Sequence, residues 1–113
     1  VAHNEEGFKE IVPEIRRIKS SRKIFVLGFV KDKPIEKIIK LFPKDGIYFF
    51  STPKISRALS LVHLDLILKK TDINYQIFES IQEAYKRALN EASNDDFIFI
   101  GGSNFTVSEI LNP

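Results

Sequence analysis

The sequence lacks cysteine, methionine and tryptophan altogether within its 113 residues. Without cysteine it has neither a disulfide framework nor a thiolate metal site, which fits a cytoplasmic protein. The longest apolar runs, Ile24–Val30 and Phe97–Ile100, are far shorter than the roughly 18 residues that span a bilayer. The polar residues at positions 3–6 do not match a signal peptide. Because methionine is missing and the first residue is valine, we expect a chain trimmed from a longer protein.

A strong charge of one sign is also missing, since 17 basic and 15 acidic residues give a net charge of +2. Nucleic-acid-binding domains usually have a larger basic surplus or a basic stripe, so we expect neither nucleic acid nor a membrane as a partner. The densest basic stretch, 16–23, falls where we expect a helix to end, and cations there interact favourably with the helix dipole. With 43% hydrophobic and 28% charged residues, the composition is that of one folded domain covering residues 1–113.

What the sequence does have is an alternation of short apolar runs with amphipathic segments. Four runs are rich in β-branched and aromatic residues and predict strands: 23–28, 46–50, 75–78 and 97–101. Three of them are apolar on both faces, as expected for a parallel sheet that is covered on both sides. Five segments predict helices from their spacing or, for the third, from length and order alone: 5–19, 34–42, 59–70, 80–92 and 103–111.

Local signals support these helices. Ser80 and Glu83 have the spacing of a capping box, and Pro34 suits a first turn. Pro13 lies inside the first helix and predicts a kink or a restart there. The spacing places the following apolar residues toward the core: Phe8, Ile11, Val12, Ile15, Ile18, Ile35, Ile38, Ile39, Phe42, Ile81, Ala84, Tyr85, Ala88, Leu89, Ala92, Val107, Ile110 and Leu111.

Strands that alternate with helices predict an α/β fold, with a doubly wound and mainly parallel sheet, helices on both faces and right-handed connections. This is a Rossmann-like arrangement. The first helix needs a strand to leave from, so we expect a first strand before Ala2 that is truncated in this chain.

In such sheets ligands bind beyond the carboxyl ends of the strands, where loops lead into helices. In the first such loop Asn4 suits a helix N-cap, and His3 titrates near neutrality and could bond a ribose, phosphate or carboxylate. In the next loop Asp32 can cap the helix that begins near Pro34. Lys31 and Lys33 beside it could neutralise phosphates, or could simply be solvated.

Two more loops carry candidate ligand contacts. Arg57 offers a planar fork for phosphate or carboxylate, and equally suits an exposed surface. Gly101 and Gly102 would let the backbone approach a ligand, and Ser103 would cap the last helix, whose N-terminus favours anions. No P-loop and no Gly-x-Gly-x-x-Gly occurs, so the chain lacks the usual equipment for holding ATP or a dinucleotide by itself. It also has no nucleophile elbow and no histidine pair at the spacing of metal ligands.

Four motifs in order resemble a known family: Ala2-His3-Asn4, Val26–Lys33, Ser56–Leu59 and Phe97–Ser103. Together they resemble the C-terminal domain of folylpolyglutamate synthase/dihydrofolate synthase, a branch of the Mur ligase superfamily. The resemblance covers essentially the whole chain.

The resemblance implies an ATP-driven ligase in which a folate or pteroate carboxylate becomes an acyl phosphate that the amine of L-glutamate attacks. ATP and Mg²⁺ would be bound mainly by a preceding P-loop domain, so no catalytic residue and no metal ligand is expected here. His3 would face the cleft near ATP or glutamate, and Ser103 would help to hold the glutamate. Asp32, Lys33 and Arg57 would lie at or near the cleft, with less definite roles.

The sequence departs from the family pattern at two places. The family motif Asp-x-Ala-His-Asn-Pro would put its aspartate just before Val1, and here Glu5 stands in place of the proline. The loop reads Asp32-Lys33-Pro34 where the family often has an acidic residue after lysine. The sequence leaves open whether the enzyme makes dihydrofolate, extends the glutamate tail, or does both. Two alternatives also remain: a peptidoglycan precursor ligase of the same superfamily, and a non-catalytic α/β regulatory module.

Overall fold

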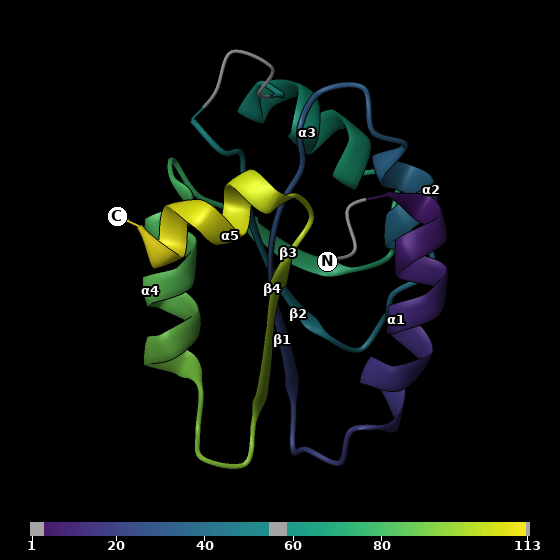
Figure 1. Cartoon of the computed structure of the whole chain (residues 1–113), viewed down its shortest axis with the longest axis vertical. Helices are drawn as coiled ribbons and strands as arrows, with labels where there is room; N and C mark the ends of the chain where they lie inside the picture. Colours follow the sequence, from purple (N-terminus) through teal and green to yellow (C-terminus); the bar gives the residue numbers. More distant parts are fainter. Residues whose placement is uncertain (1–3, 55–58, 113) are drawn as a thin grey trace.

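The structure, a computed structural model, describes residues 4–54 and 59–112. Within these residues the chain alternates between strands and helices around one sheet (Figure 1). The strands pair in parallel throughout, in the order β3-β2-β1-β4. The elements are α1 (Glu5–Arg17), β1 (Lys23–Gly28), α2 (Ile35–Ile39), β2 (Ile47–Ser51), α3 (Leu61–Leu68), β3 (Asn74–Ile77), α4 (Ile81–Glu91), β4 (Phe97–Gly101) and α5 (Asn104–Leu111). The predicted doubly wound α/β fold is confirmed, and each strand lies within one residue of its expected position.

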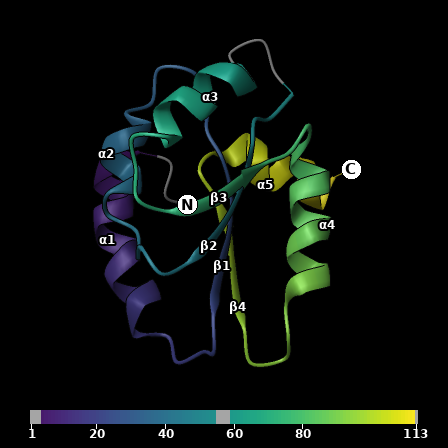
Figure 2. The same cartoon turned by 180° about the vertical axis from the view of Figure 1, so that it is seen from behind.

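Helices cover both faces of the sheet (Figures 1 and 2). The side chains of α1, α2 and α3 pack with Phe25 and Leu27 on one face, whereas those of α4 pack with Ile24 and Val26 on the other. Since successive side chains of a strand point to opposite faces, β1 must be apolar at each position from Ile24 to Leu27, where both faces are covered. This burial on both faces explains the continuous apolar run that marks β1 in the sequence.

Helix α1 runs without interruption through Pro13 to Arg17, so the predicted restart at the proline is wrong. A proline inside a helix costs about 3 kcal/mol through a lost hydrogen bond and a clash. Burial of one large apolar side chain contributes about 1.5–3 kcal/mol, and α1 buries three. These side chains outweigh the proline: Phe8, Val12 and Ile15.

Three apolar residues predicted to lie inside are instead exposed. Ile18 is 37% exposed because α1 ends at Arg17 and the backbone of Ile18 is extended. Leu89 is 49% exposed, since it lies at the border of a stripe that buries Ile81, Ala84 and Ala88. Leu111 is 71% exposed in the final turn of α5.

Strand β4 forms one edge of the sheet within the described residues, and its apolar positions 97–100 are only half-buried. The strand expected before Ala2 falls outside the described residues. No helix among residues 4–54 and 59–112 has the length and apolar character that crossing a bilayer requires.

Candidate functional site

Strands β1 and β4 are neighbours in the sheet although they come from distant parts of the sequence. The chain leaves β1 toward the face that carries α2, and leaves β4 toward α5, which lies beside α4 on the opposite face (Figures 1 and 2). The winding direction therefore reverses between the two strands. Such a reversal opens a crevice beyond the carboxyl ends of the strands, where ligands bind in doubly wound folds. The loops 29–34 and 101–103, called the switch-point loops below, border this place and form the candidate site.

The two switch-point loops are in close backbone contact through Gly28 and Gly102. Gly102 has a φ of +103°, a conformation that residues with a side chain rarely adopt. A Cβ atom on Gly102 would lie 2.4 Å from the carbonyl oxygen of Gly28. A Cβ atom on Gly28 would lie 2.6 Å from the Oγ1 atom of Thr106. Only glycine at both positions permits this approach.

Buried hydroxyl groups link the same loops. Ser103 caps α5 by accepting a bond from the backbone N–H of Thr106 at 3.2 Å, as the sequence predicts. The Oγ1 of Thr106 donates to the carbonyl oxygen of Gly28 at 2.7 Å and lies 3.1 Å from the Oγ of Ser103. The side chains are buried, with Ser103 3% exposed and Thr106 fully buried. Ser103 is thus connected to the end of β1 through the hydroxyl group of Thr106.

Asp32 does not cap α2, so that prediction is wrong. An N-cap side chain accepts from an N–H two or three residues later. For Asp32 these are Pro34, which has no N–H, and Ile35, whose N–H bonds the carbonyl oxygen of Lys33 at 2.8 Å. Asp32 instead has a φ of +74° at the tip of the loop, and both it and Lys31 are exposed, while Lys33 is half-buried. The loop that follows β1 therefore carries two lysines and an aspartate, of which Lys31 and Asp32 are exposed.

Asn4 serves as the N-cap of α1, where its Oδ1 accepts from the N–H of Gly7 at 2.9 Å. The structural interpretation of Asn4 is therefore confirmed. The other predicted contacts at this end and after β2, His3 and Arg57, lie outside the described residues. The structure consequently brings Gly102 and Ser103 together with the end of β1, from which the loop carrying residues 31–33 begins, and leaves the predicted ligand contacts as expectations.

The segment after β2 is fastened to α5. The backbone N–H of Lys54 donates to the carboxylate of Glu109, and the side-chain amide of Gln82 donates to the carbonyl oxygen of Glu109 at 3.3 Å. Helix α5 therefore contacts both β1, through Thr106, and the segment after β2, through Glu109.

Sequence reasoning missed Gly28, Thr106 and Glu109. Their partners are 55 to 78 residues away in the chain, so no local pattern marks them. The available signal was the short spacing between Ser103 and Thr106, which puts a second hydroxyl beside the helix cap.

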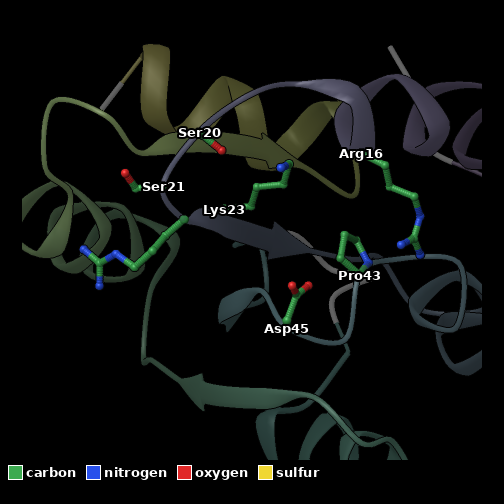
Figure 3. A pocket seen from close by; sticks show the side chains of 7 residues that line it. Arg16, Ser20, Ser21, Lys23, Pro43 and Asp45 are labelled. Carbon is green, nitrogen blue, oxygen red and sulfur yellow. The ribbon is translucent and has the colours of Figure 1, made fainter.

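A polar cavity lies at the opposite rim, near the amino ends of the strands (Figure 3). It measures about 300 Å³ and is bordered by Arg16, Lys23 and Asp45 among others. Arg16 donates to the carbonyl oxygen of Leu41 at 2.8 Å, and Lys23 donates to that of Ile18 at 2.9 Å. These cations bond carbonyl groups at helix ends, as expected for the basic stretch. The cavity is thus explained by the structure of the helix ends.

An ion pair fastens the same rim. The Oδ2 of Asp96 accepts from Arg22 at 2.7 and 3.1 Å and from the backbone N–H of Ser93 at 2.9 Å. The hydrogen bonds from Arg22 lower the pKa of Asp96, with a smaller contribution from the Ser93 N–H, and the side chain of Asp96 is only 1% exposed. The pair joins the residues that enter β1 and β4.

Residues 1–104 match the family described as the Mur ligase, glutamate ligase domain. The chain belongs to this family. A dihydrofolate synthase/folylpolyglutamate synthase from Buchnera aphidicola subsp. Acyrthosiphon pisum (strain APS) is 36% identical over 115 residues, covering 99% of this chain and 27% of that protein. The resemblance to this branch of the Mur ligases is confirmed.

The chain is also similar to a peptidoglycan precursor ligase and to a solved structure. A UDP-N-acetylmuramoyl-L-alanyl-D-glutamate–2,6-diaminopimelate ligase from Caldanaerobacter subterraneus subsp. tengcongensis is 25% identical over 117 residues, covering 97% of this chain and 24% of that protein. The structure of E. coli FolC in complex with ADP, without folate substrate, superposes with a TM-score of 0.85 at 22% identity, covering 98% of this chain and 26% of that one. This Mur ligase domain thus spans about a quarter of the length of these relatives.

Proposed function

We propose that this chain is the C-terminal, glutamate- and nucleotide-contacting domain of a larger ATP-dependent ligase. The enzyme joins L-glutamate to dihydropteroate, to a reduced folate, or to both. ATP transfers its γ-phosphoryl group to a carboxylate and gives an acyl phosphate and ADP. The amine of glutamate then attacks the acyl carbon. The bond between that carbon and the phosphate oxygen breaks, inorganic phosphate leaves, and an amide forms with release of a proton.

One observation supports the proposal: the predicted glycine–serine turn lies at the switch point of a domain whose sequence has no phosphate-binding motif of its own. Gly102 and Thr106 contact Gly28 at the end of β1, Ser103 bonds Thr106, and β1 leads into the loop that carries Lys31 and Lys33. Such a site can contact a substrate that is bound by another domain, although it cannot hold ATP by itself. The Buchnera relative, named for both synthase activities and 36% identical, supports the folate branch.

The domain works as a cover for a cleft in the full-length enzyme. Lys31 and Lys33 lie near the negative charge of the nucleotide or acyl phosphate, and Asp32 sits at the cleft edge. Ser103, with the amides of the glycine loop, helps to hold the glutamate. His3, Asn4 and Arg57 complete the proposed contacts. Closure of such a domain excludes water, which would otherwise hydrolyse the acyl phosphate.

The Mg²⁺ that the family implies is assigned to the rest of the enzyme. Within residues 4–54 and 59–112, no three histidine, cysteine or acidic side chains come together as metal ligands. The domain's part in the reaction is therefore to bind, orient and exclude water, and the phosphoryl transfer belongs to the preceding P-loop domain.

The test uses the full-length protein that contains this chain. It should release ADP and form the glutamate amide when supplied with ATP, Mg²⁺, L-glutamate and either dihydropteroate or tetrahydrofolate. The isolated 113-residue chain should show no turnover in the same assay. Turnover by the isolated chain, or a full-length protein that ligates glutamate to neither acceptor, would overturn the proposal.

A second candidate is a peptidoglycan precursor ligase, favoured by the 25% identity to the diaminopimelate ligase. The two are separated by offering the full-length protein a UDP-linked muropeptide with its amino acid in place of dihydropteroate with glutamate. A regulatory module, the remaining alternative, predicts that the gene encodes no P-loop upstream of this chain, which the upstream sequence decides.

A further inference from the structure

Thr106 is a buried threonine whose hydroxyl group leaves its own helix. A threonine in a helix commonly turns its hydroxyl onto a carbonyl of the preceding turn. Thr106 instead donates to the carbonyl oxygen of Gly28, at 2.7 Å, in a strand 78 residues earlier in the chain. Helix α5 does not need this bond, because Ser103 already caps the N–H of Thr106. The hydroxyl of Thr106 therefore serves the contact between α5 and β1.

Counting protons fixes the direction of the bonds around Thr106. A carbonyl oxygen only accepts, so the single hydroxyl proton of Thr106 points at Gly28. In the 3.1 Å contact between the hydroxyl groups, Ser103 must then be the donor and Thr106 the acceptor. The result is a directed chain from the N–H of Thr106 to Ser103, from Ser103 to the Oγ1 of Thr106, and from there to Gly28.

This series of hydrogen bonds connects both switch-point loops to the side chain of Thr106. Gly28 is the last residue of β1, so its carbonyl group sets the start of the loop toward Lys31. The backbone of Gly28 is also in contact with Gly102, and this contact is so close that no side chain fits at position 102. On the other loop, the hydroxyl group of Ser103 donates to the Oγ1 of Thr106. Thr106 thus holds the end of β1 and the hydroxyl group of Ser103 in fixed relation.

We propose that Thr106 is a positioning residue for glutamate binding, one that itself contacts no substrate. It holds the Ser103 hydroxyl and the end of β1 in register, so that the two switch-point loops meet the ligand as one unit. This inference rests on the proposed function, because it assigns glutamate to Ser103.

The chain offers a matched control for a purely structural role. The Oγ1 of Thr71 donates to the carbonyl oxygen of Leu68 at 2.6 Å, in the turn between α3 and the amino end of β3, at the opposite rim. Thr71→Val and Thr106→Val each replace a hydroxyl with a methyl group and remove one bond to a backbone carbonyl. They differ in whether that bond reaches the switch point.

The experiment compares Thr106→Val, Thr106→Ser and Thr71→Val in the full-length enzyme, with the thermal midpoint measured for each. Loss of a buried hydrogen-bonding hydroxyl should raise the KM for L-glutamate about tenfold in Thr106→Val with little change in kcat. Thr106→Ser keeps the hydroxyl and should stay within about twofold of the parent. Thr71→Val should lower the midpoint and leave the KM unchanged. Thr106→Ala serves as a second hydroxyl-free variant should valine not fold.

A double-mutant cycle tests whether Thr106 acts through Ser103. Ser103→Ala and Thr106→Val should each raise the KM for glutamate, and the double variant should be little worse than the worse single variant. Independent, multiplying effects would overturn the inference, as would equal KM values in Thr106→Val and Thr71→Val.

Hydrogen exchange gives a readout that does not depend on the assigned reaction. In Thr106→Val, the amides of residues 29–33 and 101–105 should exchange faster together, and in Thr71→Val neither segment should change. Failure of the proposed function would appear as a parent enzyme without glutamate ligation. Failure of the Thr106 inference would appear as unchanged exchange in both segments, whatever substrate the enzyme uses.

Discussion

The backbone of Gly102 packs directly against the backbone of Gly28 in the neighbouring strand, where an added Cβ would lie 2.4 Å from the Gly28 oxygen. Gly102→Ala places a methyl group in that space and also holds a side chain at a φ of +103°. Backbone strain and overpacking together predict a loss of about 2–4 kcal/mol in the free energy of unfolding. Urea unfolding of the parent and the variant measures this loss.

Gly7 provides the control for this substitution. It lies inside α1 and donates its N–H to Asn4, and its φ is not positive. Gly7→Ala is therefore expected to stabilise the protein by about 0.5–1 kcal/mol, because alanine favours the helix. The same chemical change should thus act in opposite directions at the two sites, and a similar effect at both would contradict the packing of Gly102 on Gly28.

Asp32 adopts a φ of +74° with a side chain exposed to solvent. Aspartate tolerates this left-handed region, whereas a β-branched residue does not. Asp32→Gly should leave the free energy of unfolding within about 0.5 kcal/mol of the parent, while Asp32→Val should lower it by about 1–2 kcal/mol. Lys31→Val, next to it in the same exposed loop at a φ that is not positive, should change stability by less than about 0.5 kcal/mol. Equal tolerance of valine at 31 and 32 would rule out this backbone conformation.

The Arg22–Asp96 pair predicts a specific sensitivity to acid. Hydrogen bonds from Arg22 lower the pKa of Asp96 below that of the unfolded chain. The pair therefore contributes fully above the ordinary aspartate pKa of about 4, and its contribution is lost as the pH falls through the lowered value. Asp96→Asn should reduce the thermal midpoint at neutral pH, and the difference from the parent should shrink below about pH 4.

Asp72 is the matched control, since its side chain is 80% exposed and lies 3.3 Å from Lys44. Exposed pairs of this kind contribute little, so Asp72→Asn should leave the midpoint nearly unchanged at both pH values. A difference between Asp96→Asn and the parent that stays constant down to pH 3 would show that the Asp96 carboxylate is not stabilised by its partners.

Local patterns predicted most of the fold, because most of the strands and helices carry a clear signal in their own residues. The apolar run of β1 and the cap of α4, where Ser80 accepts from the N–H of Glu83, are examples. The order of the strands was not predictable. The strand order depends on which face of the sheet each crossover helix covers. Strand β1 pairs with β4, which lies far away in the sequence, and no local pattern marks the two as neighbours.

The structure around the candidate site was predictable where a local signal marks it, as at Ser103, which caps α5 at the switch point. It was not predictable where a bond links distant segments, as between Thr106 and Gly28. The error at Asp32 has a local cause that is only partly visible in the sequence: Pro34 has no N–H, and the structure shows that the N–H of Ile35 already bonds Lys33.

Tyr75 and Asp65 predict the behaviour of the protein in alkali. The hydroxyl of Tyr75 donates to the Oδ1 of Asp65 at 2.7 Å, and burial together with this bond raises the pKa of Tyr75 to about 12. A raised pKa means that the neutral tyrosine stabilises the fold below about pH 10, and that this stabilisation is lost as the pH rises toward 12. Tyr75→Phe should therefore be less stable than the parent at pH 8, and the difference should diminish between pH 10 and 12. Asp65→Asn removes the charged acceptor and should bring the pKa of Tyr75 down, which ultraviolet titration of the phenol detects. An unchanged titration curve in Asp65→Asn would mean that burial alone holds the proton on Tyr75, and that α3 and β3 are not joined by this bond.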